Sequence, residues 1–335
     1  MTEAQHGRGL LRWLPKFLGK RILVLGDLCL DEYLIGKAQR LSREAPVPVL
    51  EFQERFTVPG AACNPALNIL SLGGQAMVAG VVGDDDTGRL LTQSLHEAGI
   101  DTAGIIVDNG RTTTLKTRVL ASHLFPQQVA RIDRQQRDPL GNATKRALWR
   151  FLTEAAPRAD AVLLSDYRSG VIDASLVAFL LGLSPKTSPL ITVDSQGDFT
   201  KFKGVSVLRC NREEAETFLH RRLGKDAAFA QAGAVLQKRL SVGTVIITRG
   251  AEGMTLVDSM GSVHHISAAT PSEVYDVTGA GDTVIALLTL ALAAGAPPVE
   301  AAHLANLAAG LVVRKLGNAT VTQGELAAAL QQANG

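Results

Sequence analysis

Close to the C-terminal end, a cluster of small residues and acids precedes a long apolar run. The segment reads Asp276-Val277-Thr278-Gly279-Ala280-Gly281-Asp282. Its small residues Gly279, Ala280 and Gly281 allow a backbone turn to approach a ligand closely. A helix that begins just after them directs unpaired N–H groups and its positive dipole end at that ligand. The pattern predicts an anion hole suited to a transferring phosphoryl group, with Asp282 as the base for an attacking hydroxyl. Gly-rich turns followed by an acid are also common in ordinary structure, so the surroundings must decide.

The elements that would position this motif alternate along the chain. Short apolar runs rich in β-branched residues predict buried parallel strands at Arg21–Gly26, Ala76–Val82, Ala161–Leu164, Leu190–Val193, Val205–Leu208 and Thr244–Thr248. Helical patterns lie between them, at Asn64–Leu72, Thr87–Ala98, Thr144–Ala155 and Glu213–His220. Alternating strands and helices predict an α/β fold, a doubly wound and mostly parallel sheet flanked by helices.

Two segments break this alternation. Tyr33–Phe56 and Ile105–Asp133 are rich in Val, Thr, Ile and Leu and have weak helical periodicity. We expect them to form a small β-sheet lid over a ligand cleft, and a homodimer that uses the exposed face and edges of this lid. No linker interrupts the sequence. We therefore expect one domain over 1–335, with an N-terminal helix or extension (1–20), lid strands (33–56 and 105–133) and a nucleotide-binding and catalytic part (134–326).

Composition excludes several classes of function. The 335 residues carry a net charge of +2, which gives no reason to expect nucleic acid as a partner. The three cysteines, Cys29, Cys63 and Cys210, form neither a disulfide framework nor a zinc motif. The basic segment 6–21 lacks a signal-peptide core, and no apolar run is long enough to span a bilayer. We expect a cytoplasmic protein with reduced thiols and no membrane partner.

The heptad D-x-T-G-A-G-D before a helix is the signature of the ribokinase-like (PfkB) carbohydrate kinases, and the chain resembles that family from Arg21 to about Leu326. The resemblance implies a ribokinase-like fold, ATP as phosphoryl donor, Mg²⁺ as cofactor and a small sugar or sugar phosphate as substrate. It also implies that Asp282 is catalytic, with Gly279, Ala280 and Gly281 as the anion hole. Chemically this combination is coherent, because phosphoryl transfer needs positioning and charge neutralisation in a closed, dry site.

On the substrate side, the segment Pro59–Asn64 resembles the family's P-G-G-x-x-N loop. The resemblance implies that Gly60, Asn64 and Asp31 bind the sugar. Each has an ordinary alternative, since Asp31 could cap a turn and Asn64 could cap the following helix. The acids of Gly83–Gly88 match a G-x-D-x-x-G turn, and we interpret them as a turn and helix start rather than as a metal cluster.

On the nucleotide side, Asn211-Arg212-Glu213-Glu214 matches N-x-x-E. The resemblance implies that Asn211 and Glu214 organise Mg²⁺ through its waters, although an isolated Glu on a helix is usually just solvated. By the same resemblance, Thr248, Gly250 and Gly253 line the nucleotide phosphates and ribose, Asn306 flanks the adenine, and Asp276 is placed for an optional K⁺. The adjacent His264 and His265 fall in an expected hairpin, where we assign them structural roles.

Within the family, the chain most resembles the kinases that phosphorylate D-glycero-β-D-manno-heptose 7-phosphate at its C1 hydroxyl, in ADP-heptose synthesis. The runs Ser42–Val49 and Glu273–Ile285 carry this resemblance most specifically. Three cations expected on lid strands, Lys116, Arg118 and Arg131, would suit a substrate phosphate. In many bacteria such kinases are fused to a nucleotidyltransferase, and we expect the kinase alone here.

Some positions depart from the heptose-kinase pattern. Ser169 and Gln196 stand where lysines are expected, and Ala61 stands where the second Gly of the substrate loop is expected. These departures leave open a ribokinase-like kinase for another sugar, sugar phosphate or nucleoside. A catalytically silent sugar-binding relative is a further alternative, against which the intact Asp282, Asn211 and Glu214 argue. A Rossmann dehydrogenase is excluded because the first strand ends in GDLCLD and lacks G-x-G-x-x-G.

Overall fold

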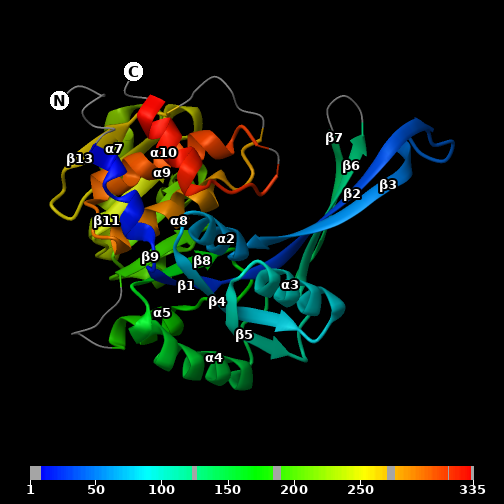
Figure 1. Ribbon diagram of the computed structural model, residues 1–335, viewed down its shortest axis with the longest axis horizontal. Coiled ribbons are helices and arrows are strands. Elements are labelled where there is room, and N and C mark those ends of the chain that lie inside the picture. The colour runs from blue at the N-terminus through cyan, green and yellow to red at the C-terminus, as the bar shows by residue number, and fades with distance from the viewer. Residues whose placement is uncertain (1–8, 123–126, 184–189, 270–275, 316, 333–335) are drawn as a thin grey trace.

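The computed structural model describes residues 9–122, 127–183, 190–269, 276–315 and 317–332. Residues 123–126 of the expected lid and 273–275 before the motif lie outside them. A large sheet of nine strands forms the centre, in the order β13-β12-β11-β10-β9-β8-β1-β4-β5 (Figure 1). Its strands are β1 (Arg21–Gly26), β4 (Gln75–Gly83), β5 (Asp101–Asp108), β8 (Ala161–Asp166), β9 (Leu190–Ser195), β10 (Val207–Asn211), β11 (Thr244–Thr248), β12 (Met254–Val257) and β13 (Val263–Ile266). All are parallel except β12 and β13.

Helices cover both faces of this sheet (Figure 1). One face packs against α2 (Cys63–Ser71), α3 (Asp86–Glu97), α8 (Ala280–Ala293), α9 (Pro298–Val312), α10 (Gln323–Gln332) and the 3₁₀ helix η1 (Leu14–Phe17). The other packs against α4 (Asn142–Ala155), α5 (Ala174–Gly182), α6 (Arg212–Leu219), α7 (Asp226–Leu240), η2 (Ala156–Arg158) and η3 (Phe199–Phe202). Strand β1 is buried on both sides, since Ile22 and Val24 enter the first core and Leu23 and Leu25 the second. The predicted α/β fold, a mostly parallel sheet flanked by helices on both faces, is confirmed.

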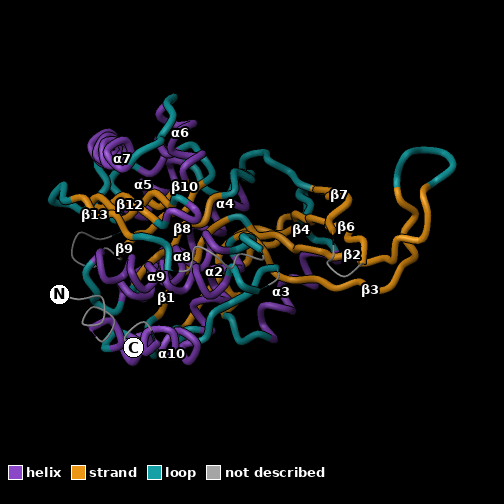
Figure 2. Tube along the Cα trace, turned by 90° about the horizontal axis from the view of Figure 1, so that it is seen from above, coloured by secondary structure: helices purple, strands orange, loops and turns teal. Residues whose placement is uncertain are grey.

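A second sheet of four strands, in the order β3-β2-β6-β7, forms the lid. Its strands are β2 (Leu28–Leu41), β3 (Pro48–Ala61), β6 (Thr114–Ser122) and β7 (Gln127–Arg134). Only Asp27 separates β1 from β2, so the chain passes directly from the central strand into the lid. Figure 2 shows the far end of the β2–β3 hairpin extending away from the body of the molecule. The root of the lid is thereby fixed at the carboxyl end of β1.

The structure corrects two sequence-based expectations. We assigned all of 105–133 to the lid, but its first residues belong to β5, which pairs with β4 at the edge of the large sheet. Apolar β-branched residues suit either sheet, so composition could not separate them. The N-terminal helix or extension expected over 1–20 is, in its described residues 9–20, a short helical turn followed by η1, and it is not a separate extension, because Leu14 and Phe17 are buried in the core. Among the described residues, no helix has the length and apolar character needed to cross a membrane.

Candidate active site

Asp282 lies in the first turn of α8 and is 7% exposed. Its two carboxylate oxygens are held separately: Asn64 Nδ2 donates to Oδ2 at 2.9 Å, and the Tyr167 hydroxyl donates to Oδ1 at 2.8 Å. Asn64 is not the N-cap of α2, a position that Ala62 occupies. Instead its amide oxygen accepts from Asn68 at 3.1 Å, which fixes the orientation of the amide toward Asp282. The carboxylate is therefore oriented before any substrate binds.

The electrostatic surroundings of Asp282 suit a general base. Burial and the nearby Asp194 carboxylate raise the pKa of Asp282 to about 7. The hydrogen bonds from Asn64 and Tyr167 and the charge of Arg209 act in the opposite direction, since they favour the ionised form. A base whose pKa lies near the operating pH combines a usable ionised fraction with a real affinity for the proton.

The turn before α8 brings backbone close to this carboxylate. Gly279 has φ +76°, in the left-handed region that glycine tolerates, and a Cβ there would lie 2.7 Å from Asn64 Nδ2. A Cβ at Gly281 would lie 2.8 Å from Arg209 Nη1. Ala280 is the first residue of α8, and its N–H donates to the Val277 carbonyl at 3.2 Å, whereas the N–H groups that follow it in the first turn have no partner within the helix. The turn therefore brings closely packed backbone up to Asn64 and Arg209, and the anion hole itself stays a prediction.

Across from this turn, the root of the lid holds Asp31. Arg118 Nη1 donates to Asp31 Oδ1 at 2.6 Å, and Asn318 Nδ2 donates to Asp31 Oδ2 at 2.7 Å. Gly60 lies opposite, where a Cβ would meet Asp31 Oδ2 at 2.3 Å, so only glycine fits. Asp31 is an interior strand residue rather than a turn cap. It is a buried and oriented carboxylate, as a sugar-hydroxyl acceptor requires.

Of the lid cations, the structure brings two to this region. Lys116 Nζ lies 5.0 Å from the centroid of the Tyr167 ring, and Arg118 combines its ion pair to Asp31 with a position 5.4 Å from the Tyr33 ring centroid. Arg131 pairs with Arg118 in the strand register, but it is exposed and its guanidinium binds Asp133 on its own strand.

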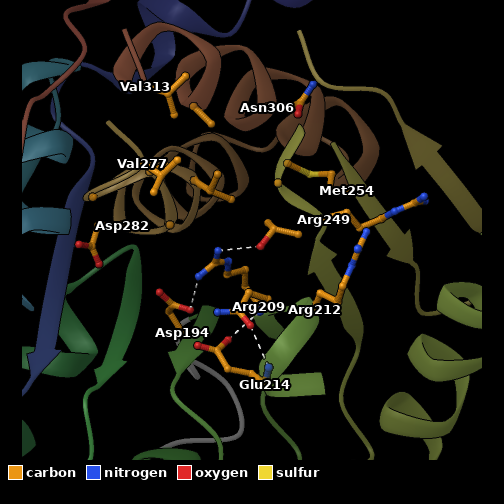
Figure 3. A pocket seen from close by; sticks show the side chains of 18 of the residues that line it. Asp194, Arg209, Arg212, Glu214, Arg249, Met254, Val277, Asp282, Asn306 and Val313 are labelled. Atoms are coloured by element: carbon orange, nitrogen blue, oxygen red, sulfur yellow. Dashed lines mark hydrogen bonds and ion pairs between the residues drawn. The ribbon is translucent and has the colours of Figure 1, made fainter. Parts of the chain in front are cut away.

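Beside Asp282 opens a cavity of about 640 Å³ (Figure 3). Every residue that the sequence assigned to the nucleotide or to the anion hole lines it: Asn211, Glu214, Thr248, Gly250, Gly253, Gly279, Ala280, Gly281, Asp282 and Asn306. Gly250 opens the 3₁₀ helix η4 (Gly250–Glu252). Asn306 Nδ2 donates to the Ser267 carbonyl at 2.7 Å, which directs its amide along the cavity wall. The volume is in the range of small-molecule and cofactor sites.

The N-x-x-E motif has a local structural role that also serves the site. Asn211 caps α6 by accepting from the Glu214 N–H at 2.8 Å, and Glu214 accepts from the Asn211 N–H at 2.6 Å. This reciprocal capping box pins the Glu214 side chain at the cavity instead of leaving it solvated. Burial and the Asp194 carboxylate raise the pKa of Glu214 to about 7. Mg²⁺ is usually bound through one or two carboxylates, phosphate oxygens and waters, a donor set that Glu214 and Asp194 fit.

Asp276 stands at the start of the motif, outside the cavity wall. Its Oδ1 accepts from the Thr278 N–H at 2.9 Å and its Oδ2 from the Gly317 N–H at 2.9 Å. Burial alone would raise the pKa of Asp276, but these hydrogen bonds outweigh it and lower the pKa. Asp276 thereby ties the turn before α8 to the segment after α9.

The positions that depart from the heptose-kinase pattern differ in backbone conformation, burial and contacts. Ala61 has φ 51°, so the backbone keeps a glycine-like conformation although the residue is alanine. Ser169 is buried and accepts from Gln135 at 2.6 Å, whereas Gln196 is exposed. Arg168, which could have replaced a lost lysine, is also exposed. Within the described part of the chain, the residues that precede and follow Ser169 and Gln196 place no lysine or arginine in the cavity wall.

Four residues of the site were not found by sequence reasoning. Only the fold brings the Tyr167 hydroxyl to Asp282, and Asn318 reaches Asp31 from a loop far along the chain. Asp194 and Arg209 form an ion pair at 2.8 Å in the floor of the cavity (Figure 3). For Tyr167, Asp194 and Arg209 the available signal was their place at or near the carboxyl ends of parallel strands, where ligands gather in this kind of sheet. Asn318 follows α9 and had no such signal.

Comparisons with known proteins agree with this geometry. The profile described as pfkB family carbohydrate kinase matches residues 20–323. Bifunctional protein HldE of Geobacter metallireducens is 42% identical over 305 residues, which cover 91% of this chain and 61% of that protein. The same-named protein of Helicobacter pylori is 41% identical over 314 residues, 93% of this chain and 67% of that protein. The chain thus spans about three fifths to two thirds of the length of these relatives.

Solved structures show the same fold. Phosphofructokinase-2 from Escherichia coli in complex with potassium superimposes with a TM-score of 0.77 at 18% identity, covering 94% of this chain and 99% of that one. Arabidopsis thaliana ribokinase complexed with ribose and ATP gives 0.73 at 19% identity, covering 94% and 99%. Because the family profile covers most of the chain and relatives exceed two fifths identity, this chain belongs to the pfkB family of carbohydrate kinases, which are ATP-dependent sugar kinases.

Proposed function

We propose that this chain transfers the γ-phosphoryl group of ATP to the anomeric C1 hydroxyl of D-glycero-β-D-manno-heptose 7-phosphate, supplying the 1,7-bisphosphate for ADP-heptose and lipopolysaccharide precursor synthesis in the cytoplasm. The observation that carries the kinase activity is the position of Asp282, held by Asn64 and Tyr167 between a nucleotide-sized cavity and the lid. The sequence resemblance and the HldE relatives support the choice of heptose phosphate.

In the proposed reaction, Asp282 accepts the proton of the sugar hydroxyl as its oxygen attacks the γ-phosphorus. The bond between that phosphorus and the bridging oxygen breaks, and ADP leaves with the electron pair. The anion hole of Gly279, Ala280 and Gly281 at the start of α8 would stabilise the negative charge on the transferred group. Asp31, Gly60 and Asn64 would position the sugar, with Asp31 accepting from its hydroxyls.

On the nucleotide side, Thr248, Gly250 and Gly253 would line the phosphates and ribose, and Asn306 the adenine. Mg²⁺ would be organised by Glu214, with Asn211 as its cap, and would supply charge neutralisation between the phosphates. A K⁺ ion near Asp276 is part of the proposal. The lowered pKa of Asp276 supports it, because an ionised carboxylate is required there.

Among the cations of the lid, Lys116 would bind the substrate phosphate, and Arg118 would hold Asp31. Lys116 and Arg118 lie at the root of the lid beside Tyr167 and Asp31, whereas Arg131 is further out and paired with Asp133. An unphosphorylated sugar is the alternative candidate substrate, because Ser169 and Gln196 carry no positive charge. A sugar that carries no phosphate would not need these cations.

We also propose that two copies associate through the lid. Large apolar side chains of the lid are unusually exposed, among them Leu41 at 69%, Phe52 at 67% and Ile132 at 63%. Large apolar side chains exposed on one small sheet favour an association site there. A dimer through the lid would cover this surface.

A coupled ADP-release screen tests the proposal. The panel is heptose 7-phosphate, ribose, fructose, their phosphates and adenosine, each with ATP and Mg²⁺. We expect kcat/KM to be highest for heptose 7-phosphate, with the product phosphorylated at C1. A higher kcat/KM for a neutral sugar or a nucleoside would transfer the assignment to that substrate. If no compound of the panel supports ADP release, a catalytically silent relative is favoured.

A further inference from the structure

The side chain of Arg209 is a buried cation in the nucleotide cavity. It extends from β10, two residues before Asn211, and is 9% exposed. Figure 3 shows its guanidinium at the cavity floor, between Asp194 and the turn that precedes α8. Arginine is rarely buried to this degree unless its charge has a partner or a task.

The contacts of this guanidinium define its orientation. Nη1 donates to Asp194 Oδ1 and Nη2 donates to Thr248 Oγ1, both at 2.8 Å. A Cβ at Gly281 would lie 2.8 Å from Nη1 and 3.0 Å from Nη2, so the guanidinium plane packs directly against the anion-hole backbone. The Nε–H is buried without a hydrogen-bond partner among the described residues. A guanidinium has five N–H donors, and these two bonds use only part of them.

The charges around Arg209 are mostly negative. Asp194, Glu214 and Asp282 all border the cavity. A polyphosphate that enters this space adds further negative charge. It therefore needs a cation that stays charged at the anion hole.

The other arginines of the cavity wall are committed elsewhere. Arg212 binds Glu252, and Arg249 binds both Glu252 and Asp226. Both also lie over the Phe229 ring, at 5.2 Å and 4.4 Å from its centroid. Of the three, only Arg209 touches the backbone of Gly281, where the transferred group would lie.

We propose that Arg209 binds the phosphate chain of the nucleotide at the N-terminus of α8 and stabilises the charge that develops on the transferred phosphoryl group. This rests on the proposed kinase function. The planar guanidinium can keep one edge on Asp194 and present other N–H groups to phosphate oxygens.

The competing explanation is that Arg209 only neutralises Asp194. A double-mutant cycle separates the two. The proteins are wild type, Arg209→Gln, Asp194→Asn and the double variant, and the measurement is the Kd of ATP, ADP and adenosine by titration calorimetry. We expect Arg209→Gln to raise the Kd of ATP and ADP by about 10- to 100-fold and to leave adenosine within about twofold. The loss between Asp194→Asn and the double variant should be of similar size.

If Arg209 were only a counter-ion, its loss would cost nothing once Asp194 is neutral, and the two Asp194→Asn proteins would bind ATP equally. That result overturns the proposal, as does an equal loss of adenosine and ATP affinity. Arg209→Lys covers the case in which the Gln variants do not fold: thermal melting confirms its fold, and a weaker Kd for ATP with unchanged adenosine affinity is expected. A wild-type protein that does not bind ATP would instead refute the proposed function.

Discussion

The Tyr167 hydroxyl donates a hydrogen bond to Asp282 Oδ1 at 2.8 Å, across 115 residues of sequence. Its backbone is fixed as firmly as its side chain, because the Tyr167 N–H donates to Asp27 Oδ2 at 2.8 Å and the Ser169 N–H to the same oxygen at 3.0 Å. Asp27 is the one residue between the central strand and the lid. The residue that orients the candidate base is thus anchored at the junction of the two sheets.

The Tyr167–Asp282 hydrogen bond predicts a shift in the pH dependence of catalysis. The bond favours the ionised carboxylate, so its loss in Tyr167→Phe raises the pKa of Asp282 above its value of about 7. The acidic limb of the kcat/KM profile should move to higher pH by about one unit, as a bond of roughly 1.4 kcal/mol implies. Because Phe keeps the ring near Lys116, activity well above the new pKa should largely recover. An unmoved acidic limb with uniformly reduced kcat would assign Tyr167 a packing role instead.

Replacement of the base itself should separate catalysis from binding. Asp282→Asn keeps the shape of the side chain and removes the proton acceptor, so kcat should fall by at least about 10²-fold while the KM of the sugar changes little. The measurement is steady-state kinetics with the best substrate of the ADP-release screen. Turnover near the wild-type rate would remove Asp282 from the mechanism.

Asp282→Asn should lower kcat but raise the stability of the folded protein. Asp282 has a folded-state pKa raised to about 7 from 3.8, so its protonated form is favoured by folding. Stability from this group is present at low pH and is lost as pH rises through about 7. The neutral amide introduced by Asp282→Asn avoids that loss. We therefore expect the inactive variant to have a higher Tm than wild type at about pH 8, and a smaller difference at about pH 5, as measured by thermal melting.

The parts of the site whose residues are close together in the chain could be predicted from the sequence. The D-x-T-G-A-G-D heptad identified Asp282 and the anion hole, because a phosphate-binding turn followed by a helix is a local structure and its residues are adjacent. N-x-x-E was equally local, and its two members prove to be a capping box. The parallel sheet was also predictable, because strands buried on both faces are continuous apolar runs.

What the sequence could not show depends on contacts between distant segments. Asn318 reaches Asp31 from 287 residues away, and Arg209 reaches Asp194 across two adjacent strands, so neither pair has a local pattern. The sequence assigned 105–108 to the lid because β-branched composition is the same in both sheets; only pairing with β4 places these residues in β5. The sequence named the cations of the lid but could not show which of them are already paired. Their partners, Asp31 for Arg118 and Asp133 for Arg131, follow only from the folded lid sheet.

Glu214 should tune the requirement for Mg²⁺. Glu214→Gln preserves the capping box, because Gln at this position also accepts from the N-cap N–H, so the fold and Tm should change little. The lost charge weakens the hold on the metal and its waters, and the Mg²⁺ concentration for half-maximal activity should rise by roughly 10-fold. Asn211→Ala is the contrasting variant, since it breaks the cap and should lower Tm. A Mg²⁺ titration of Glu214→Gln that overlays wild type would restrict Glu214 to capping α6.

The exposed lid should be the interface of a dimer. Phe52→Glu places a charge in the apolar surface of the β2–β3 hairpin and should convert the dimer into a monomer, as measured by light scattering after size exclusion. Val235→Glu is the matched control, because Val235 is 41% exposed on α7, in the body of the molecule. A wild-type monomer, or equal behaviour of the two variants, contradicts an interface at this site.

Lys116 and Arg118 lie two residues apart on the same face of β6, but their contacts differ, and so should their effects on substrate selection. Arg118 is the ion-pair partner of Asp31 at 2.6 Å, so Arg118→Ala disturbs the carboxylate that would hold the sugar hydroxyls. It should raise the KM of phosphorylated and unphosphorylated sugars alike. Lys116 Nζ lies over the Tyr167 ring and would be available to a substrate phosphate.

For Lys116→Ala we therefore expect a selective effect. The KM of heptose 7-phosphate should rise by roughly 10- to 100-fold, the loss of a charge-assisted contact, while that of the matching unphosphorylated heptose stays within about twofold. Arg131→Ala is the control, because its guanidinium is engaged by Asp133 in an exposed pair that contributes at most about 1 kcal/mol. Equal changes for both sugars in Lys116→Ala would exclude a phosphate contact there. They would favour a neutral sugar as the substrate, in agreement with the missing positive charges at Ser169 and Gln196.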